Sequence, residues 1–154
     1  MTSIAFSLPG QPATDDSVLP RAWQRVCVAR LHYHLSWSTR GRSPVLVGRR
    51  AQSLRNILEE LCRERGIQLQ ALAITPTQVK LVVSLRPSQL AATVVRELKG
   101  RSALLLFRRC PDLRIALGGH LAWNDRYALA TVSAGQLARL VDRMSLAGDE
   151  GVPA

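Results

Sequence analysis

Two hydrophobic periodicities alternate along this chain, and their order is the feature that most restricts its fold. Segments rich in β-branched and aromatic side chains are predicted strands: residues 26–38, 67–74, 79–85 and 127–132. Segments with apolar side chains at helical spacing are predicted helices: residues 49–65, 87–99, 102–109 and 136–144. The order β-α-β-β-α-β with a trailing helix predicts an α+β, ferredoxin-like (split βαβ) fold. We therefore expect one antiparallel sheet with helices on one face and an extra C-terminal helix.

The length of 154 residues suits a single domain with one core. We expect a flexible leader at residues 1–24, where Pro, Gly, Asp and Ser are frequent, a domain at 25–146 and a flexible tail at 147–154. No apolar run approaches the roughly 20 residues that span a bilayer. The three cysteines are odd in number and form no CxxC pattern, which argues against a disulfide framework and a thiolate zinc site. These features indicate a soluble, cytoplasmic protein that contacts no membrane.

The formal charge is +10, and nineteen of the 21 basic residues are arginine. A guanidinium group binds phosphate through two hydrogen bonds and stacks on bases, so this composition favours a nucleic-acid partner. A basic surface that is merely solvated is the alternative reading of the charge.

The stretch RLHYHLSW places His32 and His34 two residues apart on a predicted strand. Alternate strand residues share a face, so the two imidazoles could converge on one metal ion. Two ligands are too few for a metal site, however, and nothing in the sequence brings His120 to join them. We expect half-buried histidines that are hydrogen-bonded within the protein, and neither a metal site nor a cofactor.

Four segments, in order, resemble the single-tyrosine HUH-class transposases, which include the REP-associated and small insertion-sequence transposases. They are YHLSWSTRGRSPVL, RGIQLQALAITPTQVKLVVSL, RELKGRSALLLFRRCPDLR and GGHLAWNDRYALATV, and the likeness runs from Tyr33 to Met144. The resemblance implies a homodimeric domain that binds folded-back single-stranded DNA hairpins and, in active members, cuts them. It also implies a divalent metal held by a His-apolar-His pair, a tyrosine nucleophile on the final helix and a polar ligand from that helix.

The chain departs from that pattern at each chemical position. The His-apolar-His pair corresponds to Gln78-Val79-Lys80, the nucleophile to Leu140 and the polar ligand of the helix to Met144. A glutamine offers only a neutral oxygen, and a lysine ammonium repels a metal ion. We interpret these positions as degenerate, assign no catalytic residue, and expect a protein that is not an enzyme.

The expected function is therefore binding of structured single-stranded DNA without cleavage, by a nucleoid-associated protein. The candidate DNA-binding residues are Arg40, Arg42, Lys80, Arg96, Lys99, Arg101, Arg108 and Arg109. The aromatic residues Tyr33, Trp37 and Trp123 could stack on bases, although core packing is the commoner role.

Two alternatives remain open at this stage. One is an active nuclease with relocated chemistry through His32, His34 and either Tyr33 or Tyr127. The other is a dimeric interaction protein that has lost DNA binding.

Overall fold

The computed structural model describes residues 30–120 and 122–150, with side chains up to Leu146. The expected leader, the predicted strand residues 26–29 and the last part of the expected tail lie outside the described residues. Helix α5 extends to Glu150, into the segment expected as a tail.

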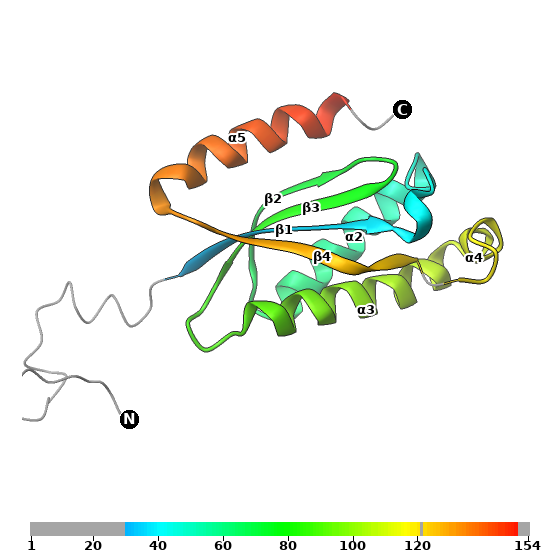
Figure 1. The fold of residues 1–154 in the computed structure, drawn as a ribbon, viewed down its shortest axis with the longest axis horizontal. Helices are drawn as coiled ribbons and strands as arrows, with labels where there is room; N and C mark the ends of the chain where they lie inside the picture. The colour runs from blue at the N-terminus through cyan, green and yellow to red at the C-terminus, as the bar shows by residue number, and fades with distance from the viewer. Residues whose placement is uncertain (1–29, 121, 151–154) are drawn as a thin grey trace, which may run out of the picture.

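One four-stranded sheet runs through the molecule in the order β2-β3-β1-β4, with every neighbouring pair antiparallel (Figure 1). This order confirms the predicted ferredoxin-like plan, because the first strand lies next to the third and fourth strands. The strands are β1 (Leu31–Thr39), β2 (Gln68–Ile74), β3 (Gln78–Leu85) and β4 (Trp123–Val132).

The helices form two layers. Helices α2 and α3 cover one face of the sheet, and α5 lies across the opposite face, where it packs mainly against β2 (Figure 1). A short 3-10 turn, η2, follows β1, and a short helix, α4, follows α3. The bounds are η2 (Arg40–Arg42), α2 (Arg49–Glu64), α3 (Ala91–Arg109), α4 (Pro111–Ala116) and α5 (Ala134–Glu150). Among residues 30–120 and 122–150, no helix is long and apolar enough to cross a bilayer.

The main core lies between the sheet and the α2–α3 layer. Leu35 and Leu81 are paired on adjacent strands and fully buried, and they belong to the same cluster as Leu58 of α2 and Leu98 of α3. Strand alternation sends the intervening residues, such as His34, to the opposite face beneath α5.

The predicted break at Gly100 is wrong, because α3 continues through it to Arg109. The buried residues Val95, Leu98, Ser102 and Leu106 continue at helical spacing across the glycine. Packing along this stripe outweighs the roughly 1 kcal/mol by which a mid-helix glycine is disfavoured.

Other boundaries also differ from the prediction. Pro87 lies in a turn closed by a bond from the Gln89 N–H to the Arg86 carbonyl, and α3 begins only at Ala91. Helix α4 was not predicted, and its proline occupies the first helical turn, where the missing N–H removes no hydrogen bond. Strand β4 begins at Trp123 and not at Tyr127.

Candidate functional site

Helix α5 is attached to the sheet by a small apolar cluster. Ala71, Ala73, Val82 and Met144 are buried together, and Leu137, Leu140 and Val141 pack against them. Met144 is only 5% exposed, so the position to which the sequence resemblance would assign a polar ligand is here part of an apolar contact. The side of α5 that faces the sheet is thus set by apolar residues at helical spacing.

The other two compared positions, Gln78 and Lys80, lie on the same side of the sheet. Lys80 pairs with Ser36 on β1 and Ala73 on β2, and Gln78 pairs with Ser38. Directly opposed residues share a face, and Ala73 belongs to the α5 cluster, so both polar side chains are on the α5 side. Both are half-buried. The four positions that the family resemblance marks as degenerate therefore lie together: Gln78 and Lys80 on one face of the sheet, and Leu140 and Met144 on the helix that covers this face.

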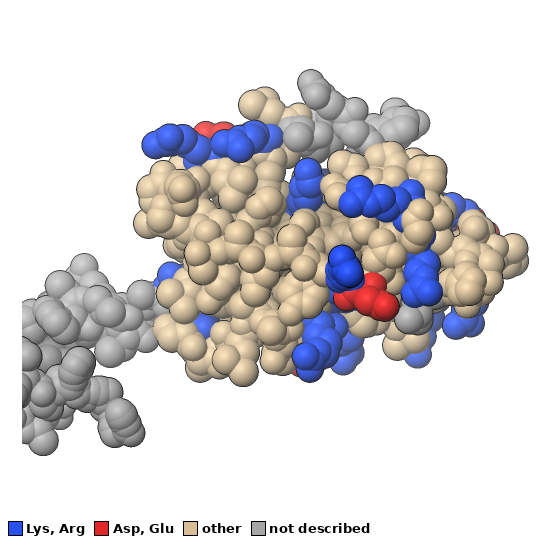
Figure 2. All heavy atoms as spheres, in the orientation of Figure 1, with Lys and Arg blue, Asp and Glu red and all other residues tan. Residues whose placement is uncertain are grey.

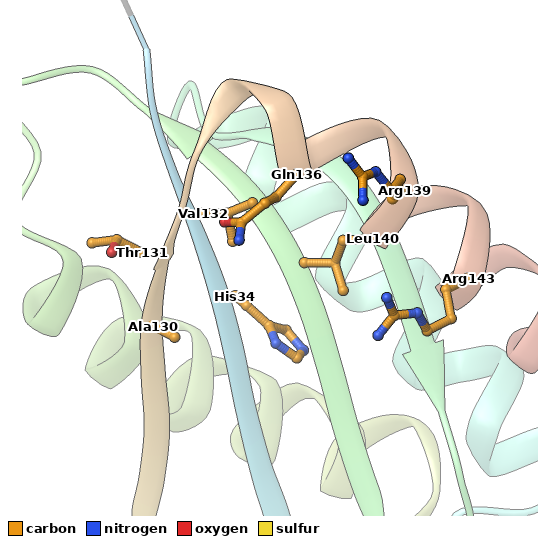
Figure 3. Close-up of a pocket in the computed structure, with 8 residues that line it drawn as sticks. All are labelled: His34, Ala130, Thr131, Val132, Gln136, Arg139, Leu140 and Arg143. Atoms are coloured by element: carbon orange, nitrogen blue, oxygen red, sulfur yellow. The ribbon is translucent and has the colours of Figure 1, made fainter.

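A cavity of about 320 Å³ lies between the sheet and α5, close to these positions (Figure 3). His34 projects into it from β1, and Ala130, Thr131 and Val132 line it from β4. Helix α5 lines the other side of the cavity with Gln136, Arg139, Leu140 and Arg143. Of these four side chains only Leu140 is apolar.

His34 is chemically unusual within this cavity. Its Nε2 atom is buried and has no hydrogen-bond partner among the described residues. The prediction that this histidine is hydrogen-bonded within the protein is therefore wrong for Nε2. Burial lowers the pKa of His34, and the positive charge of Lys80 lowers it further. The ring is therefore neutral near pH 7 in an electropositive setting.

His32 has a different environment from His34. Its Nδ1 lies 2.6 Å from the Oγ of Ser84, which is fully buried and also accepts a 3.1 Å bond from Gln70 Nε2. His120 is exposed in the loop after α4. In the described part of the chain, no three His, Cys, Asp or Glu side chains are grouped so that they could hold a metal ion.

The two candidate tyrosines lie on the other face of the sheet from the two histidines. Tyr33 packs against the main core, and Tyr127 pairs with Trp37, which also faces that core. His32 and His34 alternate with Tyr33 and so face α5. A sheet thus separates the groups that a relocated nuclease site would have to combine.

Trp37 and Trp123 are core residues, which is the commoner of the two roles considered for them in the sequence analysis. Trp37 and Trp123 are 2% and 4% exposed and form an edge-to-face pair with centroids 6.0 Å apart. Trp123 Nε1 donates to the Lys99 carbonyl at 3.0 Å and to Ser102 Oγ at 3.1 Å. Neither indole ring is available for stacking on a base.

The candidate DNA-binding residues differ in whether other groups of the protein already bind their charged ends. Lys99 Nζ donates to the carbonyl groups of Asn124, Asp125 and Arg126 at 2.7, 3.2 and 3.4 Å, and burial lowers its pKa. Arg109 pairs with Glu60 at 3.0 Å. The remaining arginines on η2 and α3 are exposed: Arg40, Arg42, Arg96, Arg101 and Arg108. Basic atoms clearly outnumber acidic ones on the face shown in Figure 2.

The family of the chain follows from comparison with known proteins. A profile described as "Transposase IS200 like" matches residues 27–142, which is most of the sequence. The chain belongs to the IS200-like transposase family. It is 35% identical over 113 residues to the ISDra2 transposase TnpA of Deinococcus radiodurans, covering 73% of this chain and 81% of that protein. The IS200 transposase of Salmonella typhimurium is 21% identical over 100 residues, covering 65% of this chain and 66% of its own length.

Solved structures of this family agree with the fold. A transposase-family protein from Deinococcus radiodurans R1 superimposes with a TM-score of 0.65 at 33% identity, covering 78% of this chain and 92% of that one. A REP-associated tyrosine transposase bound to a REP hairpin gives a TM-score of 0.57 at 17% identity, covering 80% and 69%. The family resemblance and the fold class expected from the sequence are both confirmed.

The sequence reasoning did not select Arg139 and Arg143 as candidate site residues. Their spacing of four residues on the predicted final helix already put them on one helix face. That spacing could not show that His34, about a hundred residues earlier, lies opposite them.

Proposed function

We propose that this IS200-like transposase-family protein binds structured single-stranded DNA, hairpins in particular, and does not cleave it. The observation that carries the proposal is the chemistry of one side of the sheet. Gln78 and Lys80 occupy the strand positions at which the family resemblance implies metal-binding histidines, while Leu140 and Met144 occupy those of the nucleophile and the polar ligand.

Three of these four side chains cannot perform the implied chemistry, and Gln78 offers a metal ion only one neutral oxygen. A divalent ion needs lone-pair donors, whereas a lysine ammonium offers only N–H donors and repels the ion. An aliphatic side chain at 140 has no oxygen to attack phosphorus. The burial of Met144 among alanine and valine side chains further supports a structural role for the helix position that a ligand would otherwise occupy.

A positive charge at Lys80 can nevertheless interact with a strand phosphate in place of a metal ion. Lys80 is half-buried, and no acidic side chain among the described residues lies within 4.0 Å of its ammonium nitrogen. The exposed arginines of η2 and α3 would supply the remaining phosphate contacts. Lys99 and Arg109 contribute less in this proposal, because carbonyl groups and Glu60 already engage them.

A DNA hairpin is the proposed ligand because a solved protein of similar fold is bound to a REP hairpin. At 17% identity this similarity supports a shared fold only, so the hairpin ligand is our proposal for this chain. A DNA partner also accounts for the net charge of +10 and implies residence in the cytoplasm with the chromosome.

We further propose that the protein is a homodimer. Strand β4 is at an edge of the sheet and is exposed along most of its length, with Tyr127 and Leu129 at 42% and 39% exposure. An uncovered edge of this length presents free backbone N–H and carbonyl groups to a second chain. Light scattering coupled to size exclusion should give twice the monomer mass.

The test begins with selection of bound oligonucleotides from a random hairpin pool. Affinity for the selected hairpin is then compared with that for a duplex of the same sequence, by fluorescence anisotropy over a range of salt concentrations. Lys80→Ala and Arg101→Ala should each weaken hairpin binding by about 3- to 10-fold through loss of a charged contact. Arg63→Ala, an exposed arginine on α2, is the matched control and should leave affinity unchanged.

Cleavage is tested separately with magnesium and manganese on the selected hairpin. The proposal predicts intact DNA and no protein–DNA adduct after boiling in detergent. A metal-dependent cut or an adduct would instead support the relocated nuclease. Hairpin affinity no better than duplex affinity, and lost at modest salt, would support an interaction protein without specific DNA binding.

A further inference from the structure

The cavity between β1, β4 and α5 has two guanidinium groups at its helix side. Arg139 and Arg143 are one helical turn apart, so about 6 Å of axial rise separates them and both project on the same side of α5. In Figure 3 the guanidinium group of Arg143 and the ring of His34 point toward one another across the cavity. Leu140 lies between the two arginines and forms an apolar wall.

Neither cation forms an ion pair with a described side chain. The ion pairs of the described side chains are Arg50–Asp112, Arg65–Glu97 and Arg109–Glu60, and none involves α5. Lys80 adds a further positive charge on the same face of the sheet, close enough to lower the pKa of His34. Two cationic side chains that line the cavity, with a third positive charge nearby on the sheet, favour occupation by an anion.

His34 supplies a directed donor at the floor of this hollow. Its Nε2 is shielded from solvent and makes no bond to any described residue, which is costly for a buried polar atom unless a ligand satisfies it. The neutral ring can carry its proton on Nε2 and donate it to an anionic oxygen. Gln136, which also lines the cavity, adds a neutral hydrogen-bonding side chain.

We infer that this cavity is a phosphate-binding pocket in which Arg139 and Arg143 grip the phosphate oxygens and His34 Nε2 donates a hydrogen bond to one of them. Guanidinium groups suit a phosphate because their paired N–H donors match its oxygens. A volume of about 320 Å³ exceeds the needs of a bare phosphate and leaves room for an attached sugar along the wall of Leu140 and Val132. The phosphate is that of a free nucleotide or of a nucleic acid strand, and the second source rests on the proposed function.

The pocket is tested through the His34 ring by NMR titration of the full-length chain at pH 7. The chain has three histidines, and His34→Asn identifies the signal. Inorganic phosphate, thymidine 5′-monophosphate and an unstructured oligothymidine are titrated separately. Saturable movement of the His34 signal with any of them supports the pocket. Movement with the first two indicates a free nucleotide, and movement with the oligonucleotide alone indicates a strand phosphate.

Arginine variants provide the matched comparison. Arg139→Gln and Arg143→Gln should each weaken binding about 10-fold or more, as expected for loss of one charged hydrogen-bond partner. Arg63→Gln on α2 has the same charge change far from the cavity and should have no effect. A His34 signal that stays fixed with all three ligands overturns the inference, and so does an equal response in the Arg63 and Arg143 variants.

This outcome is separable from the DNA-binding proposal. If the protein binds hairpins but the His34 signal does not move, the phosphate pocket is refuted and the proposed function stands. If the His34 signal moves but the protein shows no preference for hairpins, the proposed function is refuted and the pocket stands.

Discussion

Gly100 and Gly48 provide a matched test of how backbone conformation contributes to the stability of this fold. An added Cβ meets no atom within 4 Å at either glycine, so neither position restricts the side chain by space. Gly100 lies within helix α3, whereas Gly48 has φ of +55° and ψ of −123°, in a region that L residues rarely adopt. The two positions therefore differ in backbone conformation and not in packing.

Gly100→Ala should stabilise the protein by about 0.5 to 1 kcal/mol, because alanine loses less backbone entropy in a helix. For a domain of this size such a gain raises Tm by roughly 1 to 4 °C. Gly48→Ala should instead destabilise it by about 1 to 3 kcal/mol, since alanine pays a steric cost at that backbone conformation. Urea unfolding followed by circular dichroism measures both changes. Destabilisation by Gly100→Ala would refute the continuous α3 helix, and equal effects at the two sites would refute the role of backbone conformation.

Three further predictions concern buried polar groups. Because burial and Lys80 hold the pKa of His34 below its ordinary value of 6.5, the unfolded chain takes up this proton first. Stability should therefore be highest above about pH 6.5 and fall as the pH drops below it, and His34→Asn should reduce that slope in urea unfolding at pH 7.5 and 5.5. Trp123→Phe leaves the Lys99 carbonyl and Ser102 Oγ without their indole donor and should cost about 1 to 3 kcal/mol in the same assay. Burial, with a smaller effect from Glu59, raises the pKa of Cys62 to about 12, so iodoacetamide at pH 8 should modify this thiol only in denaturant, as peptide mass spectrometry would show.

Helix α2 shows what local periodicity can predict. Six apolar positions recur at helical spacing in residues 49–65, and all of them are buried in the structure. The sequence also predicts the order of the four strands, since the split βαβ plan follows from the order of the elements. These features are encoded within short windows of the chain, where spacing alone distinguishes a helix from a strand.

Gly100 shows where local reasoning fails. Helix propensity disfavours glycine at one position, but the contacts of Leu98, Ser102 and Leu106 with the rest of the core are not visible in that window. The phosphate pocket is beyond such reasoning for the same reason. It joins a strand residue to two residues on a helix at the other end of the chain, and only the crossing of α5 over the sheet brings them together.

The proposed loss of cleavage makes the changes around α5 mutually dependent. A polar ligand at position 144 is useful only while a metal ion is present to satisfy it. Without a metal ion, a buried polar side chain at 144 that found no hydrogen-bond partner would cost about 1 to 3 kcal/mol. Methionine avoids that cost and packs against Val82 and the alanines of β2. On this argument, restoring one position alone lowers stability without restoring chemistry, and the positions behave as a coupled group in a mutant cycle. The arginines that flank Leu140 are not subject to this constraint, because they are exposed residues that line the cavity beside this contact, and they can bind a phosphate whether or not a metal is bound.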